Sequence, residues 1–234
     1  MGVEHEWIGH GRAAASVPVR RRLGTVCAVR RDAGVAGVAY MLGRRVGLPG
    51  VRLEWFVVYE HSRPSDPDTE FRWAGRGDLA ALAAFDRGEE VVRTRLDRGD
   101  RVAVAEEDDA IAGWVWITPA GVYDEGGLMF HLGPGDAWAY DGMVDPALRG
   151  RGISPRLRRA VSADMREDGI ERLLSTVDRL NTSSHRASVR SGSEVARFLQ
   201  FQIGPMGVVR IAADRGARWH AYRGTLDVRV PPGS

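Results

Sequence analysis

Asp145-Pro-Ala-Leu-Arg-Gly-Arg-Gly-Ile-Ser154 is the stretch of this sequence that decides the fold. It follows a strand-like run, residues 137–144, and it precedes a helix-like run, residues 155–168. Glycine lets a backbone approach a bulky ligand closely, and the N–H groups of a loop that enters a helix carry partial positive charge. Arg149 and Arg151 add formal charge. The stretch therefore predicts a binding site for the pyrophosphate of a cofactor at a strand-to-helix crossover.

Two common phosphate-binding loops do not fit this stretch. A P-loop ends in Gly-Lys-Ser/Thr, and the sequence contains no lysine. A dinucleotide-binding loop, Gly-x-Gly-x-x-Gly, would need a glycine at position 155, which is Pro155. The absence of lysine also excludes a Schiff-base lysine and an anchor for pyridoxal phosphate.

A third loop type fits, because Arg149-x-x-Gly152-x-Ser154 resembles the Arg/Gln-x-x-Gly-x-Gly/Ala motif of the GNAT superfamily of N-acetyltransferases. Ser154 departs from the usual Gly or Ala, but it is also small. The stretch Asn181-x-x-Ser184 resembles the segment that opens the helix after the fifth strand in that family. Two motifs in the right order are more specific than either one alone. The resemblance covers residues 69–215.

The resemblance implies an α/β fold with a mixed, mostly antiparallel central sheet. We expect this sheet to be splayed at the acyl-CoA site and flanked by helices. The sequence order of strand, two helices, hairpin, strand, loop and helix agrees with a domain over residues 51–225. Before it, residues 1–50 predict an N-terminal helical extension, and after it residues 226–234 predict a tail.

The resemblance also implies the site. Acetyl-CoA or a longer acyl-CoA is the expected donor, with its thioester carbonyl polarised by backbone N–H groups near Met143 and Val144. The amide of Asn181 is expected to meet the pantetheine arm, although Asn and Ser are also good helix caps. The residues expected to bind the donor are Met143, Val144, Arg149, Gly150, Arg151, Gly152, Ile153, Ser154, Asn181 and Ser184.

The catalytic acid and base are less constrained by the sequence. Tyr140 is expected to face the cleft with Trp138, and Asp141 to face away unless a bulge reverses the alternation. His131 is expected on the neighbouring strand, with an ordinary pKa suited to proton transfer. Many family members carry a tyrosine as the acid at the position of Ser188, so that role is in doubt here. The candidates are thus Tyr140, Asp141, His131 and Ser188, with His185 as a weaker one.

Composition excludes several classes of protein. Among 234 residues, 44% are hydrophobic, yet no window approaches ~18 uninterrupted apolar residues, so we expect no integral membrane segment. The net charge of +2 gives no basic stripe of the kind that binds nucleic acid. The single cysteine, Cys27, rules out an intramolecular disulfide and a multi-cysteine zinc site, and we expect no metal. The preference for arginine over lysine suggests a GC-rich bacterial genome, and we expect a cytoplasmic protein.

The sequence thus predicts an N-acetyltransferase that moves an acetyl or other acyl group from acyl-CoA to a primary amine of a small molecule, by direct attack in a ternary complex. Three alternatives stay open at this point. In the first, the acceptor is a protein amine. In the second, the domain is an acyl-CoA sensor without catalytic activity. In the third, it is a protein-interaction module that uses residues 1–50. A homodimer is also left open.

Overall fold

The structure, a computed structural model, describes residues 35, 37–45, 49–61, 70–85, 88–119, 121–213 and 216–230. The predictions for residues 1–34, including Cys27, lie outside these residues. Residues 37–45 are helical. The hydroxyl of Tyr40 in that helix accepts a hydrogen bond of 2.8 Å from the backbone N–H of Trp55, which ties the helix to the first strand. Within the described residues, no helix is long and apolar enough to cross a membrane.

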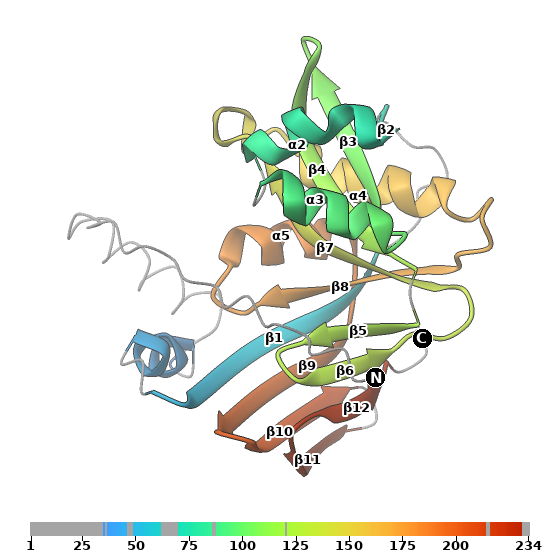
Figure 1. The fold of residues 1–234 in the computed structure, drawn as a ribbon. Coiled ribbons are helices and arrows are strands. Elements are labelled where there is room, and N and C mark those ends of the chain that lie inside the picture. Colours follow the sequence, from blue (N-terminus) through green and yellow to red (C-terminus); the bar gives the residue numbers. More distant parts are fainter. Residues whose placement is uncertain are drawn as a thin grey trace.

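A nine-stranded sheet forms the centre of the molecule, in the order β11-β10-β9-β1-β8-β7-β4-β3-β2 (Figure 1). Its strand pairs are antiparallel except for β7 with β8, which run parallel. This confirms the predicted α/β class with a mostly antiparallel sheet. The strands are β1 (Val51–His61), β2 (Arg72–Ala74), β3 (Arg101–Glu107), β4 (Ala110–Thr118), β7 (Asp136–Val144), β8 (Arg172–Asp178), β9 (Gly192–Ile203), β10 (Met206–Ala213) and β11 (Gly216–Arg223).

A second, three-stranded sheet has the order β12-β6-β5, from β5 (Val122–Glu125), β6 (Leu128–His131) and β12 (Leu226–Arg229). One sequence expectation was wrong here, namely that residues 226–234 form only a tail. The predicted tail begins as a strand, because Leu226, Val228 and Val230 alternate and pack on the same apolar cluster as Phe130.

The helices cover the central sheet from both sides (Figure 1). On one side lie α4 (Ile153–Asp164) and α5 (Thr182–Ser191). On the other lie α2 (Leu79–Phe85) and α3 (Glu89–Asp97), together with the small sheet. Two short 3-10 turns, Arg76–Asp78 and Pro146–Leu148, precede α2 and α4.

Side chains of β7 alternate between these two sides. Ala137 and Ala139 pack in one buried cluster with Leu157 and Val161 of α4. Trp138 packs in another with Phe130 of β6, and Tyr140 borders that second cluster. We call the first side the helix face and the second the small-sheet face.

The sheet opens between β7 and β8. The two strands pair only from Asp136–Ala139 to Arg172–Ser175. Beyond that point β7 continues along β4 as far as Val144, while β8 continues along β1 as far as Asp178. We call this opening the fork. It confirms the predicted splay of the central sheet.

Candidate functional site

The loop that leaves β7 is held by short-range hydrogen bonds. The Asp145 carboxylate accepts from the N–H of Ala147 at 2.7 Å, which caps the 3-10 turn. Arg149 Nε donates to the carbonyl of Val144 at 3.2 Å. Gly150 and Gly152 have φ of +89° and +78°, which side chains other than glycine rarely adopt. Both glycines are therefore required by the turn itself.

The same loop presents the N-terminus of α4. Gly152 is the N-cap of α4, and no side chain caps the helix. Ser154 already lies inside the first turn, so its hydroxyl does not cap the helix. First-turn N–H groups have no partner within a helix and attract phosphate. Arg151 is exposed beside them, and its guanidinium donates to Glu107 at 3.1 Å.

A β-bulge lies in β7 at the fork. Trp114 of β4 pairs with Met143 and Trp116 with Tyr140, so that two residues of β7 face one of β4. Asp141 in the bulge has a φ of +43° and forms an ion pair with Arg95 of α3. A bulge in this strand was the condition under which Asp141 was expected to face the cleft instead of away from it. Both Tyr140 and Asp141 consequently interact with residues at the small-sheet face.

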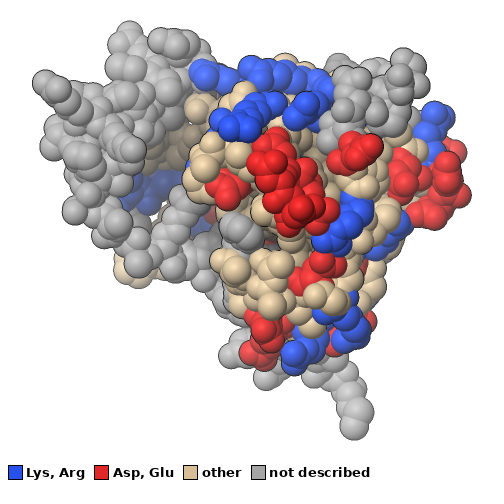
Figure 2. All heavy atoms as spheres, turned by 90° about the horizontal axis from the view of Figure 1, so that it is seen from above, with Lys and Arg blue, Asp and Glu red and all other residues tan. Residues whose placement is uncertain are grey.

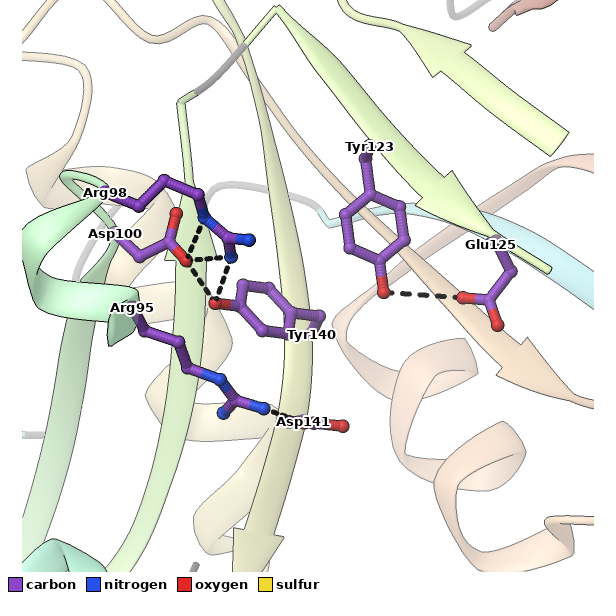
Figure 3. Close-up of polar contacts among 7 residues, drawn as sticks. All are labelled: Arg95, Arg98, Asp100, Tyr123, Glu125, Tyr140 and Asp141. Carbon is purple, nitrogen blue, oxygen red and sulfur yellow. Dashed lines mark hydrogen bonds and ion pairs between the residues drawn. The ribbon is translucent and has the colours of Figure 1, made fainter. Parts of the chain in front are cut away.

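Figure 3 shows seven side chains that gather on that face, and we call them the carboxylate–tyrosine cluster. One of its arginines lies over two aromatic rings: the Arg95 guanidinium is 5.0 Å from the ring centroid of Trp116 and 5.1 Å from that of Tyr140. The members come from α3, the turn between α3 and β3, β5 and β7, and they are Arg95, Arg98, Asp100, Tyr123, Glu125, Tyr140 and Asp141.

Tyr140 is held as a hydrogen-bond donor in this cluster. Its hydroxyl donates to the carboxylate of Asp100 and accepts from Arg98 at 3.2 Å. Burial and the bond to Asp100 raise the pKa of Tyr140 above its ordinary value. A phenol with a raised pKa stays protonated at neutral pH and is poorly suited to accept a proton from a substrate.

Glu125 is the carboxyl that the sequence reasoning missed. It accepts a hydrogen bond of 2.8 Å from the Thr176 hydroxyl on β8, just past the last pair of β7 with β8, and one of 3.4 Å from the Tyr123 hydroxyl. The side chain keeps some accessible surface, but desolvation of its carboxyl raises the pKa of Glu125 to about 7. The signal in the sequence was the alternation of Tyr123 and Glu125 before the Gly126-Gly127 turn.

His131 does not lie beside β7, and that expectation was wrong. The neighbours of β7 are β4 and β8, whereas β6 belongs to the small sheet. The turn of residues 133–135 takes the chain from one sheet into the other. The His131 side chain is 44% exposed, and its Nε2 is 2.7 Å from the carboxylate of Asp227 on β12.

The second motif forms the start of α5. Asn181 is its N-cap, with Oδ1 accepting from the N–H of Ser184 at 3.2 Å. His185 lies between the Tyr59 hydroxyl and Arg179, which engage its two ring nitrogens. Ser188 is fully buried, and its hydroxyl accepts from Arg158 Nη1 at 2.8 Å. The position expected to hold an acid is thus occupied by a small hydroxyl bound to an arginine.

The structure brings the predicted residues together in two groups and separates one from them. The β7 end, its loop and the start of α4 form a continuous segment, and α5 lies against α4 on the helix face. Tyr140 and Asp141 lie on the small-sheet face with Glu125, while His131 lies apart. Within the described residues, no group of three histidine, cysteine or acidic side chains is placed to hold a metal ion.

Comparison with known proteins gives a family. The model of the acetyltransferase (GNAT) family matches residues 52–192, more than half of the 234 residues. No curated protein matches the sequence. A GNAT-family acetyltransferase from Colwellia psychrerythraea has a similar structure, with a TM-score of 0.51 and 13% identity over 79% of this chain and 72% of that one. A second, from Novosphingobium aromaticivorans, gives a TM-score of 0.46 and 19% identity over 66% and 63% of the two chains.

Proposed function

The chain belongs to the GNAT family of acetyltransferases, and from that premise we propose that it transfers an acetyl or other acyl group from acyl-CoA to the primary amine of a small molecule. The observation that carries the proposal is the fork between β7 and β8. It has a phosphate-type loop at its end and, beside Thr176, a carboxyl with a pKa of about 7.

The residues of the loop fit the pyrophosphate of CoA. The free N–H groups at the start of α4 favour an anion, and Arg149 and Arg151 flank Gly150 with guanidinium groups that suit phosphate oxygens. No Cβ is present at Gly150 or Gly152, where the space is open and the backbone can be approached. Asn181 and Ser184 at the start of α5 are proposed to meet the pantetheine arm, and the backbone near Met143 and Val144 to polarise the thioester carbonyl.

Glu125 is proposed as the general base. A protonated amine cannot attack, so its proton must first be removed, and a carboxyl with a pKa near 7 exchanges protons readily at neutral pH. The amine nitrogen then forms the C–N bond with the thioester carbon. The C–S bond breaks, the sulfur keeps the electron pair, and the second proton that the nitrogen loses passes to solvent.

The small-sheet face favours an enzyme over a silent sensor, because a desolvated carboxyl with a raised pKa costs stability and is characteristic of catalytic sites. Glu125, which forms no ion pair among the described residues, also favours an acceptor that arrives as a cation. Figure 2 shows blue and red side chains interleaved on the upper surface, so neither sign covers that view alone, and we propose no nucleic-acid partner. A protein amine as acceptor remains the alternative, and a panel of amines and peptides decides it.

Two further proposals concern the whole protein. We propose that the protein is a bacterial enzyme of the cytoplasm, the compartment in which acyl-CoA is made. Pairing of two copies stays a prediction, for which the exposed apolar side chains of β10 and β11, among them Met206, Val208 and Trp219, are candidates. Analytical ultracentrifugation of the full chain tests the pairing directly.

The test of the function is binding and turnover of acetyl-CoA. Gly152→Val should abolish CoA binding in calorimetry, because the side chain blocks the backbone at the loop. Gly204→Val is the matched control, since Gly204 also has a positive φ and open space but lies in the β9–β10 turn. Arg151→Glu should weaken binding strongly by replacing attraction with repulsion. Wild-type protein that binds neither CoA nor acetyl-CoA would overturn the proposal.

A further inference from the structure

Arg158 is a buried cation at the fork that the proposed function does not use. It lies on α4 and is only 8% exposed. Its Nη1 donates to the Ser188 hydroxyl of α5 at 2.8 Å. A Cβ placed on Gly142 of β7 would lie 3.4 Å from its Nη2. The guanidinium therefore reaches from α4 to the β7 bulge on one side and to α5 on the other.

The polar groups around Arg158 are neutral. His61 of β1 lies between the hydroxyls of Ser191 and Ser175, at 2.9 and 2.8 Å from its two ring nitrogens. Burial, and then the charge of Arg158, lower the pKa of His61 well below its ordinary value. Among the described residues, Arg158 forms no ion pair, and its buried Nε has no hydrogen-bond partner.

A buried charge without a counterion is costly, and removal of charge by deprotonation does not relieve it here. Burial lowers the pKa of Arg158 to about 10, so the guanidinium still carries its proton at neutral pH. The natural way to offset such a cost is an anion from outside the chain. Gly142 beside the guanidinium is exposed, so the protein surface lies next to this buried charge.

We propose that Arg158 binds the thiolate of CoA that is released when the acyl group leaves, with Ser188 holding the guanidinium in place. This inference rests on the proposed function, since that reaction generates the thiolate in the fork. The C–S bond breaks with both electrons on sulfur, and Arg158 stabilises the resulting negative charge by a charge-assisted hydrogen bond while keeping its own proton. No acid on α5 is then needed to protonate the sulfur.

The test compares binding of CoA with that of desulfo-CoA, in which hydrogen replaces the thiol. Calorimetry is done slightly above the ordinary thiol pKa of about 8.5. We expect wild-type protein to bind CoA about tenfold or more tightly than desulfo-CoA, as a hydrogen bond to a charged group would give. Arg158→Met should remove this preference and leave the affinity for desulfo-CoA unchanged.

Three variants complete the design. Arg158→Lys should keep part of the preference because it keeps the charge. Arg159→Met, which removes the next arginine of the same helix, should keep all of it. Arg158→Gln replaces Arg158→Met if the latter does not fold, as judged by circular dichroism.

The outcomes separate this inference from the proposed function. An unchanged preference in Arg158→Met overturns the assignment of the thiolate. Equal loss of both ligands also overturns it, and shows that Arg158 only shapes the fork. Failure of wild-type protein to bind either ligand overturns the proposed function as well.

Discussion

The two faces of the fork are built from opposite chemistries. On the helix face, Arg158 is surrounded by neutral groups, Ser188 and the hydrogen-bonded His61 among them. On the small-sheet face, Asp100 and Asp141 are each paired with an arginine, whereas Glu125 is bound by the neutral donors Thr176 and Tyr123. Among the described residues, each face thus holds one desolvated ionisable group that forms no ion pair, a cation on one side and a carboxyl on the other.

Under the proposed function, this difference assigns the reactants to the two sides. A cation with neutral neighbours favours an anion, and a carboxyl whose pKa is raised, above all by desolvation, readily takes a proton from an amine. The acyl donor leaves a negative charge and the acceptor brings a positive one. In the proposed reaction, the fork would therefore separate the two charges across the sheet, with Arg158 toward the donor and Glu125 toward the acceptor.

The largest expected effect comes from removing the base on the small-sheet face. Glu125→Gln should lower kcat/KM by about 10²- to 10⁴-fold, the usual range for loss of a general base. In wild-type protein, kcat/KM should rise with pH through about 7, the pKa to which desolvation raises Glu125. The variant should lose this limb of the profile, while calorimetry shows unchanged affinity for CoA.

Asp124→Asn is the matched control for Glu125→Gln. Asp124 is the neighbouring carboxyl of β5, it is exposed, and its Oδ1 accepts from the N–H of Gly127 at 2.8 Å, a bond that asparagine retains. The control should keep both the rate and the limb. A Glu125→Gln enzyme with a wild-type pH profile would show that the two faces do not divide the proton chemistry as argued.

A smaller effect is expected at the other two candidates on the same face. Tyr140→Phe and Asp141→Asn should each lower kcat/KM by about tenfold or less, because they disturb packing and hydrogen bonds of the cluster without removing the base. Both should keep the limb near pH 7. Loss of the limb in either one, with Glu125 present, would move the base to that residue and leave Glu125 as a structural carboxyl.

How much of this could be read from the sequence depends on how local each feature is. The turn at Gly150 and Gly152 and the cap at Asn181 are set by neighbours within a few residues, so the loop and the start of α5 were found. The contacts of Arg158 with Ser188 and of Glu125 with Thr176 join residues 30 and 51 positions apart. No spacing rule predicts such pairs before the strand order is known.

For His131, the strand was predicted correctly but its position next to β7 was not. Residues 128–132 do read as a strand, and β6 spans Leu128–His131. However, β6 leaves the central sheet and pairs with β12, a strand that was expected to be part of a tail. His131 was therefore placed beside β7 only because the order of strands in space was taken from their order in the chain.

The pH dependence of the free energy of unfolding tests the contrast between the two faces through a smaller effect. The folded-state pKa of Glu125 is raised from 4.5 to about 7, so its contribution to stability is fully present below 4.5 and is lost as pH rises through 7. Glu125→Gln has no ionisable group at this position, so the variant does not lose stability in this way as pH rises. The variant should therefore gain stability over wild-type protein at pH 8, by at most about 1.4 kcal/mol for each pKa unit, and the gain should vanish in acid.

Arg158→Met is the counterpart on the helix face. Replacing a buried charge without a counterion by an apolar side chain of similar length is often neutral or stabilising. We therefore expect urea denaturation to give an unchanged or higher free energy of unfolding at neutral pH. A strong loss of stability would mean that the guanidinium is already satisfied within the folded chain, and the contrast between the two faces would then fail.

The smallest expected effect concerns Asn181, where the cap and the ligand-binding role can be separated. Asn181→Ala should cost about 1 kcal/mol of stability, because the hydrogen bond to the N–H of Ser184 is lost. Asn181→Ser restores a cap of similar strength but has no amide to offer the pantetheine arm. If Asn181 contacts the donor, the serine variant regains its stability in urea denaturation but keeps a raised KM for acetyl-CoA. If the serine variant regains both, Asn181 only caps α5, and the donor is held on the helix face by the loop and the fork alone.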